Sequence, residues 1–213
     1  LYQLLDAQEI FLKNKSIAMN HRLSKIKDKQ ASVEAIDFRV DRHIDKSTLH
    51  SLASLNFIRA YQNIIITGKT GTGKSYLAQA LANRAIVGGH RVFYVRTPTL
   101  LEEIRISRMD GTYTNLLKRY SRFHLLVLDD FGVAPMQGDD ATNLFEIIED
   151  RTDINSTIIT SQLPVNEWYG YLSNNTIADA LLDRIVNSSH RVELQGESMR
   201  KRKSFLNQIE EKK

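Results

Sequence analysis

The sequence predicts a three-layer α/β fold with a parallel sheet of about five strands. Strands and helices alternate along the chain, and the segment 125–128, Leu-Leu-Val-Leu, is apolar throughout. A strand that is apolar on both faces suits a sheet covered by helices on both sides. With 213 residues, 42% of them hydrophobic, the chain can form one such core and little more. We therefore expect an N-terminal helical segment and linker over residues 1–46 and one α/β domain over 47–213.

The expected elements follow from the hydrophobic pattern in chain order. A helical pattern without glycine or proline runs from residue 1 to about 31, and a charged, irregular linker follows over 32–47. Ser47 or Thr48 is expected to cap the next helix, which leads into the first strand. The later elements are expected as follows: strands at 64–66, 91–95, 125–129, 156–160 and 191–194; helices at 76–87, from 98 and after Gly111, from 139 and at 175–188; and a charged C-terminal helix after Gly196.

Residues 68–75, Gly-Lys-Thr-Gly-Thr-Gly-Lys-Ser, have the spacing of a P-loop between a strand and a helix. Its glycines allow backbone N–H groups to point inward and contact phosphate oxygens. Lys74 is expected to reach the β- and γ-phosphates of ATP, and the Ser75 hydroxyl is expected to bind Mg²⁺. The alternative is a glycine-rich turn with a chance lysine, which the order of strand, loop and helix disfavours. The expected nucleotide-binding residues are Gly68, Lys69, Thr70, Gly71, Thr72, Gly73, Lys74 and Ser75.

Two acids stand at the end of the third expected strand. Ligands in open α/β sheets bind outside the carboxyl ends of the strands, so Asp129 is expected beside the P-loop as a ligand of Mg²⁺. Asp130 is expected to orient the attacking water as a base. Two carboxylates that follow four apolar residues are costly to bury without a cation, which argues against a purely structural role.

Composition excludes some functions. The chain has no cysteine and therefore no disulfide, thiol nucleophile or cysteine-ligated metal, and its six histidines lack zinc-binding spacing. Neither a signal peptide nor an apolar run long enough for a membrane span is visible, so we expect a cytoplasmic protein without a membrane partner. The net charge of +4 is compatible with an anionic partner.

A basic stripe is expected on the N-terminal helix. At 100° per residue, four cations fall on one face beside an apolar stripe. We interpret this face as a contact to the phosphates of duplex DNA with little sequence preference, and a merely solvated helix face is the alternative. The candidate DNA-binding residues are Lys15, Arg22, Lys25 and Lys29.

Four segments together resemble one family. GKTGTGKS, LLVLDDFG, TIITSQLPVNEW and DALLDRIV are similar to the AAA+ ATPases of the helicase-loader clade, and most similar to the IstB-like transposition helper ATPases of bacterial insertion sequences. The similarity covers roughly residues 34 to 202. It implies an ATPase that forms homo-oligomers on DNA and recruits or stimulates a transposase. The DnaC- and DnaI-like relatives load replicative helicases instead, and that role is the alternative.

The resemblance also implies roles for single residues. It places residues 68–75 in the Walker A motif and Asp129 and Asp130 in Walker B, where most AAA+ proteins have glutamate at the second acid. Gln162 matches the sensor-1 position, although a plain strand-end hydrogen bond is the alternative. Arg200 resembles a sensor-2 arginine. No separate helical lid is expected, because the chain ends at Lys213.

Arg184 resembles the arginine finger that reaches a neighbouring subunit's γ-phosphate. A salt bridge with Asp183 or Asp179 is the alternative. Three functions remain open: an assembly-coupled ATPase, a nucleotide-gated DNA-binding adaptor that hydrolyses slowly because Asp130 replaces glutamate, and a small-molecule kinase. The doubled acid and the segment around Arg184 disfavour the kinase.

Overall fold

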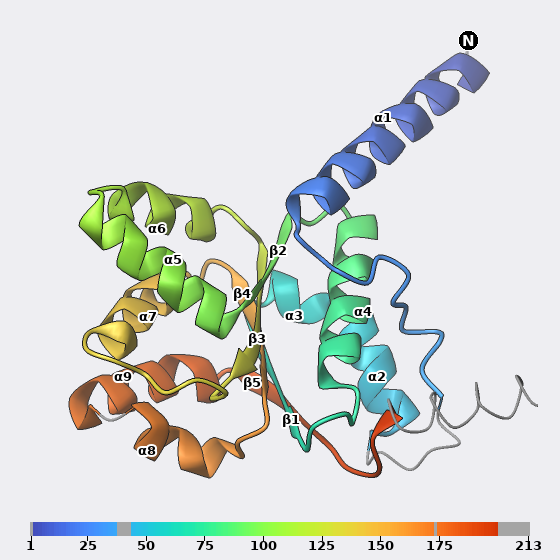
Figure 1. Cartoon of the computed structure of the whole chain (residues 1–213). Coiled ribbons are helices and arrows are strands. Elements are labelled where there is room, and N and C mark those ends of the chain that lie inside the picture. The colour runs from blue at the N-terminus through green and yellow to red at the C-terminus, as the bar shows by residue number, and fades with distance from the viewer. Residues whose placement is uncertain (1, 38–43, 173, 200–213) are drawn as a thin grey trace, which may run out of the picture.

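Five parallel strands form one sheet at the centre of the protein. The computed structural model describes residues 2–37, 44–172 and 174–199 (Figure 1). The strand order is β2-β3-β4-β1-β5, and every neighbouring pair is parallel, which confirms the predicted sheet. The strands are β1 (Asn63–Gly68), β2 (Val92–Arg96), β3 (Leu125–Phe131), β4 (Ser156–Ser161) and β5 (Ser189–Leu194).

Helices cover both faces of the sheet and complete the three layers (Figure 1). On one face pack α2 (Lys46–Ala53), α3 (Asn56–Arg59) and α4 (Lys74–Val87), together with the end of α1 (Tyr2–Leu23). The other face carries α5 (Thr97–Met109), α6 (Tyr113–Ser121), α7 (Asp140–Glu149), α8 (Trp168–Leu172) and α9 (Asn175–Val186). A short 3₁₀ helix, Val165–Glu167, precedes α8. Because both faces are covered, β1, β3 and β4 are almost fully buried, as the apolar sequence of 125–128 predicted for β3.

The N-terminal helix is shorter than the sequence predicted. It ends at Leu23, and Lys25 adopts a left-handed backbone with φ 60°. Tertiary hydrogen bonds explain this end: Tyr94 N donates to Ser24 O at 2.7 Å, and the Gln79 side-chain oxygen accepts from Lys27 N at 3.1 Å. These bonds redirect the chain along α4, so the prediction of a helix to residue 31 is wrong.

The stretch after α1 is also more buried than a linker. Ile26, Val33 and Ile36 are each less than 9% exposed and belong to the core on the α4 face. Residues 38–43 of the expected linker lie outside the described residues. The boundary at residue 46 stays a prediction, but the buried residues before it belong to the same core as α4.

The segment between the linker and β1 forms two helices rather than one. Asp45, and not Ser47 or Thr48, caps α2: its carboxylate accepts from Thr48 N at 2.6 Å. Leu55 adopts φ 62° between α2 and α3, which breaks the single helix that the sequence predicted. The short α8 begins at Trp168.

The first helix projects from the body at the end of the sheet where α4 ends and β2 begins (Figure 1). Ile10, Phe11 and Leu12 on this helix are each more than half exposed. Within the described ranges, the apolar stretches of the helices are too short or too interrupted by charge for a membrane crossing.

Candidate nucleotide-binding site

The P-loop joins the carboxyl end of β1 to the start of α4. Lys74 is 7% exposed, and its ammonium donates to the carbonyl oxygens of Gly68 at 2.7 Å and Lys69 at 2.9 Å. Gly71 has φ 86°, and a Cβ there would lie 2.2 Å from Ser198 Oγ, so only glycine fits beneath the C-terminal segment. The loop therefore has the open backbone and buried cation that phosphate binding requires.

Asp129 lies beside the P-loop, as the sequence predicted. Ser75 Oγ donates to Asp129 Oδ1 at 2.9 Å, and the carboxylate is 3% exposed. The hydroxyls of Tyr94 and Thr160 also donate to it. Burial, followed by the hydrogen bond to Asp129, raises the pKa of Tyr94, so the phenol stays protonated and serves as a donor. The carboxylate is thus held in place next to the hydroxyl that the P-loop provides.

An irregular step in β3 gives the second acid a different orientation. Two β3 residues, Asp129 and Asp130, stand opposite Thr160 alone, between the pairs Leu128 with Ile159 and Phe131 with Ser161. Such a bulge bends a strand and redirects its side chains. Asp130 adopts φ 59°, and its N–H donates to Thr160 Oγ1 at 3.1 Å. Its side chain lines the cavity beside the P-loop.

Arg96 pairs with the carboxylate of Asp130. Its Nε lies 2.7 Å from Asp130 Oδ2, with the two side chains 44% and 27% exposed. Arg96 ends β2, and in the register of the sheet it stands opposite Asp129. The sequence analysis missed this residue, although an arginine directly after a strand that ends at the same edge was an available signal. Strand order, which places β2 next to β3, was the missing information.

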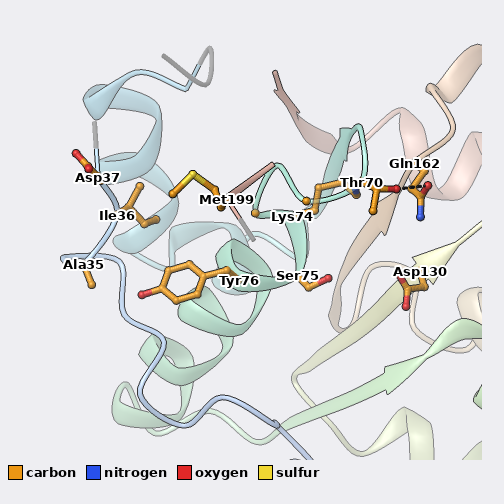
Figure 2. Close-up of a pocket in the computed structure, with 12 residues that line it drawn as sticks. Ala35, Ile36, Asp37, Thr70, Lys74, Ser75, Tyr76, Asp130, Gln162 and Met199 are labelled. Atoms are coloured by element: carbon orange, nitrogen blue, oxygen red, sulfur yellow. Dashed lines mark hydrogen bonds between the residues drawn. The ribbon is translucent and has the colours of Figure 1, made fainter. Parts of the chain in front are cut away.

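Gln162 also reaches the P-loop. It directly follows β4, and its side-chain oxygen accepts from Thr70 Oγ1 at 2.7 Å (Figure 2). This contact brings the predicted sensor-1 residue to the site. Its role in sensing nucleotide remains a prediction.

A cavity of about 510 Å³ opens beside the P-loop. Its walls come from segments far apart in the sequence: the stretch before α2, the P-loop with the first turn of α4, the ends of β3 and β4, and the C-terminal segment (Figure 2). Tyr76, Ile36 and Met199 add an apolar side next to the polar phosphate loop. The sequence analysis did not identify these three, because only the fold brings them to Lys74.

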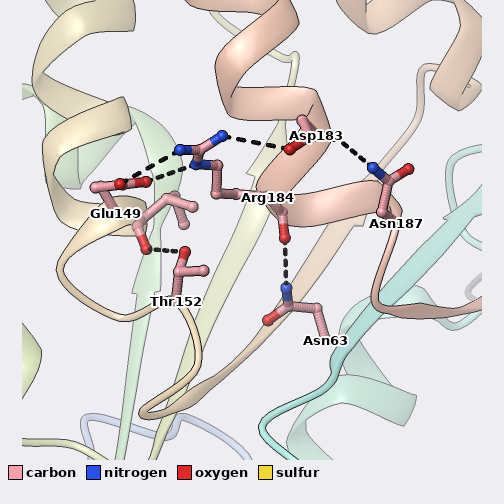
Figure 3. A network of polar contacts seen from close by, with 7 residues as sticks. Asn63, Glu149, Thr152, Asp183, Arg184 and Asn187 are labelled. Atoms are coloured by element: carbon pink, nitrogen blue, oxygen red, sulfur yellow. Dashed lines mark hydrogen bonds and ion pairs between the residues drawn. The ribbon is translucent and has the colours of Figure 1, made fainter.

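Arg184 lies at the opposite edge of the sheet. Its guanidinium pairs with Glu149 at 2.6 Å and with Asp183 at 3.3 Å (Figure 3). Its backbone oxygen accepts from the side chain of Asn63, the first residue of β1. The ion pair with Asp183 matches the structural alternative that the sequence left open, and the pairing with Glu149 was not expected.

The remaining predicted residues fall in three places. Lys15 and Arg22 lie on α1, whereas Lys25 and Lys29 follow its end at Leu23, so the four cations do not share a helical stripe. The reason is the same early end of the helix. Arg200 lies outside the described residues.

A parallel sheet, a P-loop at the end of β1 and an acid at the end of β3 beside its serine define a P-loop nucleotide-binding protein of the AAA+ type. Comparison with known proteins then gives the family. The model of the family described as "IstB-like ATP binding protein" matches residues 1–207, and the chain belongs to this family.

Relatives support the assignment at the level of sequence. Two insertion-sequence ATP-binding proteins of Sinorhizobium fredii are 39% and 41% identical over 198 residues, covering 93% of this chain and 80% and 79% of theirs. An insertion-sequence IS5376 ATP-binding protein of Geobacillus stearothermophilus is 27% identical over 212 residues, covering all of this chain and 84% of its own.

Solved structures share the fold at lower identity. DnaI has a TM-score of 0.64 at 21% identity, covering 78% of this chain and 92% of its own, and the DnaC helicase loader has 0.64 at 18%, covering 79% and 99%. AMPPCP-bound DnaA from Aquifex aeolicus has 0.66 at 21%, covering 88% of this chain and 57% of that one. The chain thus spans little more than half of DnaA, and these likenesses show the fold alone.

Proposed function

We propose that this protein is an ATP-dependent, DNA-binding ATPase that assembles on DNA and assists a transposase in insertion-sequence transposition. One observation carries the ATPase part. Ser75, the last residue of the P-loop, has its Oγ 2.9 Å from the buried carboxylate of Asp129, and Lys74 of the same loop is buried. A hydroxyl and a carboxylate oxygen are ligands that Mg²⁺ takes together with phosphate oxygens. Lys74 would balance phosphate charge, and the apolar side of the cavity around Tyr76 would receive the adenine ring of ATP.

The proposed catalytic groups divide between two protomers. Asp130 lines the cavity and is the candidate base for the attacking water. Gln162 contacts Thr70 of the P-loop and is the candidate sensor of the γ-phosphate. Arg184 sits at the far edge of the sheet, where it is available to a neighbouring protomer and not to its own P-loop. Hydrolysis would therefore depend on assembly.

The DNA and transposase parts of the proposal rest on charge and on relatives. The chain carries a net charge of +4, and its relatives are ATP-binding proteins of insertion sequences. Phosphate contacts depend on cations and not on a base-reading element. Lys15 and Arg22 on the projecting α1, and Lys25 and Lys29 just after it, remain candidates for such contacts.

A nucleotide-gated adaptor that hydrolyses slowly is the second candidate, and the Arg96–Asp130 ion pair favours it. Arg96 Nε lies 2.7 Å from Asp130 Oδ2, so this oxygen is already occupied and is not available to accept a hydrogen bond from an attacking water. In that case ATP binding would control assembly on DNA, and turnover would contribute little.

Steady-state ATP hydrolysis with and without duplex DNA separates the two candidates. The first predicts that DNA increases the rate per protomer, and that an insertion-sequence transposase binds the ATP-bound assembly. The second predicts ATP-dependent DNA binding at a rate of hydrolysis that DNA leaves unchanged. Absence of nucleotide binding would exclude both.

A further inference from the structure

Cations gather at the amino-terminal edge of the sheet, opposite the nucleotide site. Three segments meet there: the end of α3, the turn from α4 into β2, and the turn from α6 into β3. Leu125 N, at the start of β3, donates to Arg91 O at 3.2 Å and holds two of these loops together. We call the basic residues of these segments the amino-edge cluster: Arg59, His90, Arg91, Arg122 and His124.

The two histidines link this cluster, because each lies close to the other and to one arginine. Both nitrogens of the His124 ring lie 3.3 Å from Arg91, one from its backbone N and one from its guanidinium. The His90 and His124 rings meet edge to face with centroids 5.7 Å apart. Across the described residues, no carboxylate lies within 4 Å of the charged nitrogens of Arg59, Arg91 or Arg122.

A buried arginine adds to the positive field. Arg151 is 1% exposed, and its guanidinium donates to the backbone oxygens of Tyr120, Phe123 and Ser156 at 2.6–2.9 Å. Burial lowers the pKa of Arg151 to about 9, which leaves it charged at neutral pH. Burial, and then Arg91, His90 and Arg151, lower the pKa of His124, so its neutral form is favoured beside these basic groups.

We propose that the amino-edge cluster binds the phosphate backbone of duplex DNA. The guanidinium groups of Arg59, Arg91 and Arg122 have no carboxylate within 4 Å among the described residues. A phosphate that accepts hydrogen bonds from them would supply the missing anionic partner. The cluster lies at the same end of the sheet as the base of α1, where Arg22 occupies the last turn (Figure 1). A duplex held there would run past α1 and away from the ATP cavity. This inference rests on the proposed DNA-binding function and names its contact surface.

The test compares two variants that lose the same charge. Arg59→Ala/Arg91→Ala/Arg122→Ala removes three cations of the cluster. Lys46→Ala/Arg84→Ala/Arg191→Ala removes three exposed cations elsewhere. Fluorescence anisotropy with two unrelated labelled 20-base-pair duplexes, with an ATP analogue and at salt concentrations from 50 to 200 mM, gives affinity and its salt slope. Thermal unfolding and affinity for the ATP analogue report on folding.

Each lost phosphate contact should reduce the slope of log K against log salt by about 0.9, so the cluster variant should lose about 2.7. The factor by which the cluster variant binds DNA more weakly than the parent should shrink by about 40-fold between 50 and 200 mM salt, equally on both duplexes. The control variant should keep the parental slope. Arg→Lys at the same three positions should restore most of the binding, because the charges remain. If the alanine variant unfolds, Arg59→Ala alone should still lower the slope by about 0.9.

Four results would overturn the inference. A parental slope in the cluster variant and in Arg59→Ala moves the DNA contacts elsewhere and leaves the proposed function intact. An equal loss of salt slope in the control variant shows that net charge alone, and not the cluster, determines DNA binding. Polyglutamate serves as a second, peptide probe. If the cluster variant loses polyglutamate binding and keeps its DNA binding, the cluster is assigned to an acidic protein partner. Absence of duplex binding by the parent contradicts the proposed DNA-binding function itself.

Discussion

Replacement of Arg184 by alanine tests whether this residue acts on a neighbouring protomer. Arg184 is anchored beside Asn63, and the P-loop begins at Gly68, the other end of β1. Five residue steps of a strand span about 17 Å, well beyond the length of an arginine side chain. Arg184 therefore cannot reach the phosphates of its own site, and any effect on hydrolysis must cross an interface.

The magnitude of the effect distinguishes the two roles. Arg184 pairs with Glu149 at 2.6 Å, and the side chains are 33% and 46% exposed. A pair this exposed changes an equilibrium constant by at most about fivefold. An arginine finger changes the rate by about 10³ to 10⁵, or about 4–7 kcal/mol in the barrier. We therefore expect Arg184→Ala to reduce assembled ATPase activity at least a thousandfold, with nearly unchanged nucleotide affinity.

Glu149→Gln is the matched control, because it breaks the same ion pair and keeps Arg184. ATP hydrolysis is measured at concentrations where the protein assembles, together with binding of a fluorescent ATP analogue and thermal unfolding. Mixing Arg184→Ala with Lys74→Ala protein should restore some activity, because each variant supplies what the other lacks. If Arg184→Ala and Glu149→Gln lose the same small amount of activity, the arginine is structural and the reasoning fails.

Four further predictions concern the cavity and the histidines. Lys74→Ala should abolish binding of a fluorescent ATP analogue, and unchanged affinity would place the nucleotide elsewhere. Asp130→Asn should keep ATP affinity but lower turnover by about 10²–10⁴, whereas a parental rate would remove Asp130 from the mechanism. Gly71→Ala should cost about 1–2 kcal/mol in stability, seen by thermal unfolding, because its φ is 86° and its Cβ would meet Ser198; a parental melting temperature contradicts this. Stability should also fall as the pH drops below the ordinary histidine pKa of about 6.5, because burial lowers the pKa of three histidines in the folded protein and the unfolded chain then binds more protons. Thermal unfolding between pH 7.5 and 5.5 tests this, and a flat profile would contradict it; the histidines are His21, His90 and His124.

Most of the fold and half of the site could be predicted because their signals are local. The P-loop needs eight consecutive residues, and each strand is a short apolar run between turn residues. Asp129 followed from one rule, that parallel strands bring their carboxyl ends to the same edge. Its contact with Ser75 confirms the predicted position of Asp129 beside the P-loop.

The rest depended on contacts between distant segments. Nothing in residues 24–31 breaks a helix, yet bonds from Tyr94 and to Gln79 end α1 at Leu23. Periodicity does not contain such tertiary bonds, and they outweigh helix propensity. Arg96 could not be paired with Asp130 without the order of β2 and β3.

The parallel sheet also explains why the amino-edge cluster escaped the sequence analysis. Its loops carry only one or two cations each, which in a sequence window are ordinary surface charge. All strands of a parallel sheet begin at the same edge, so the fold brings these basic residues together there, next to the loop before β4 that carries Asp150 and Asp153, whereas Asp129 and Asp130 lie at the other edge. About 17 Å of strand separates the two edges. On this proposal, ATP in the cavity would be too far away to contact DNA bound at the cluster, and a dependence of DNA affinity on ATP would come from assembly, which would multiply the number of clusters on one duplex.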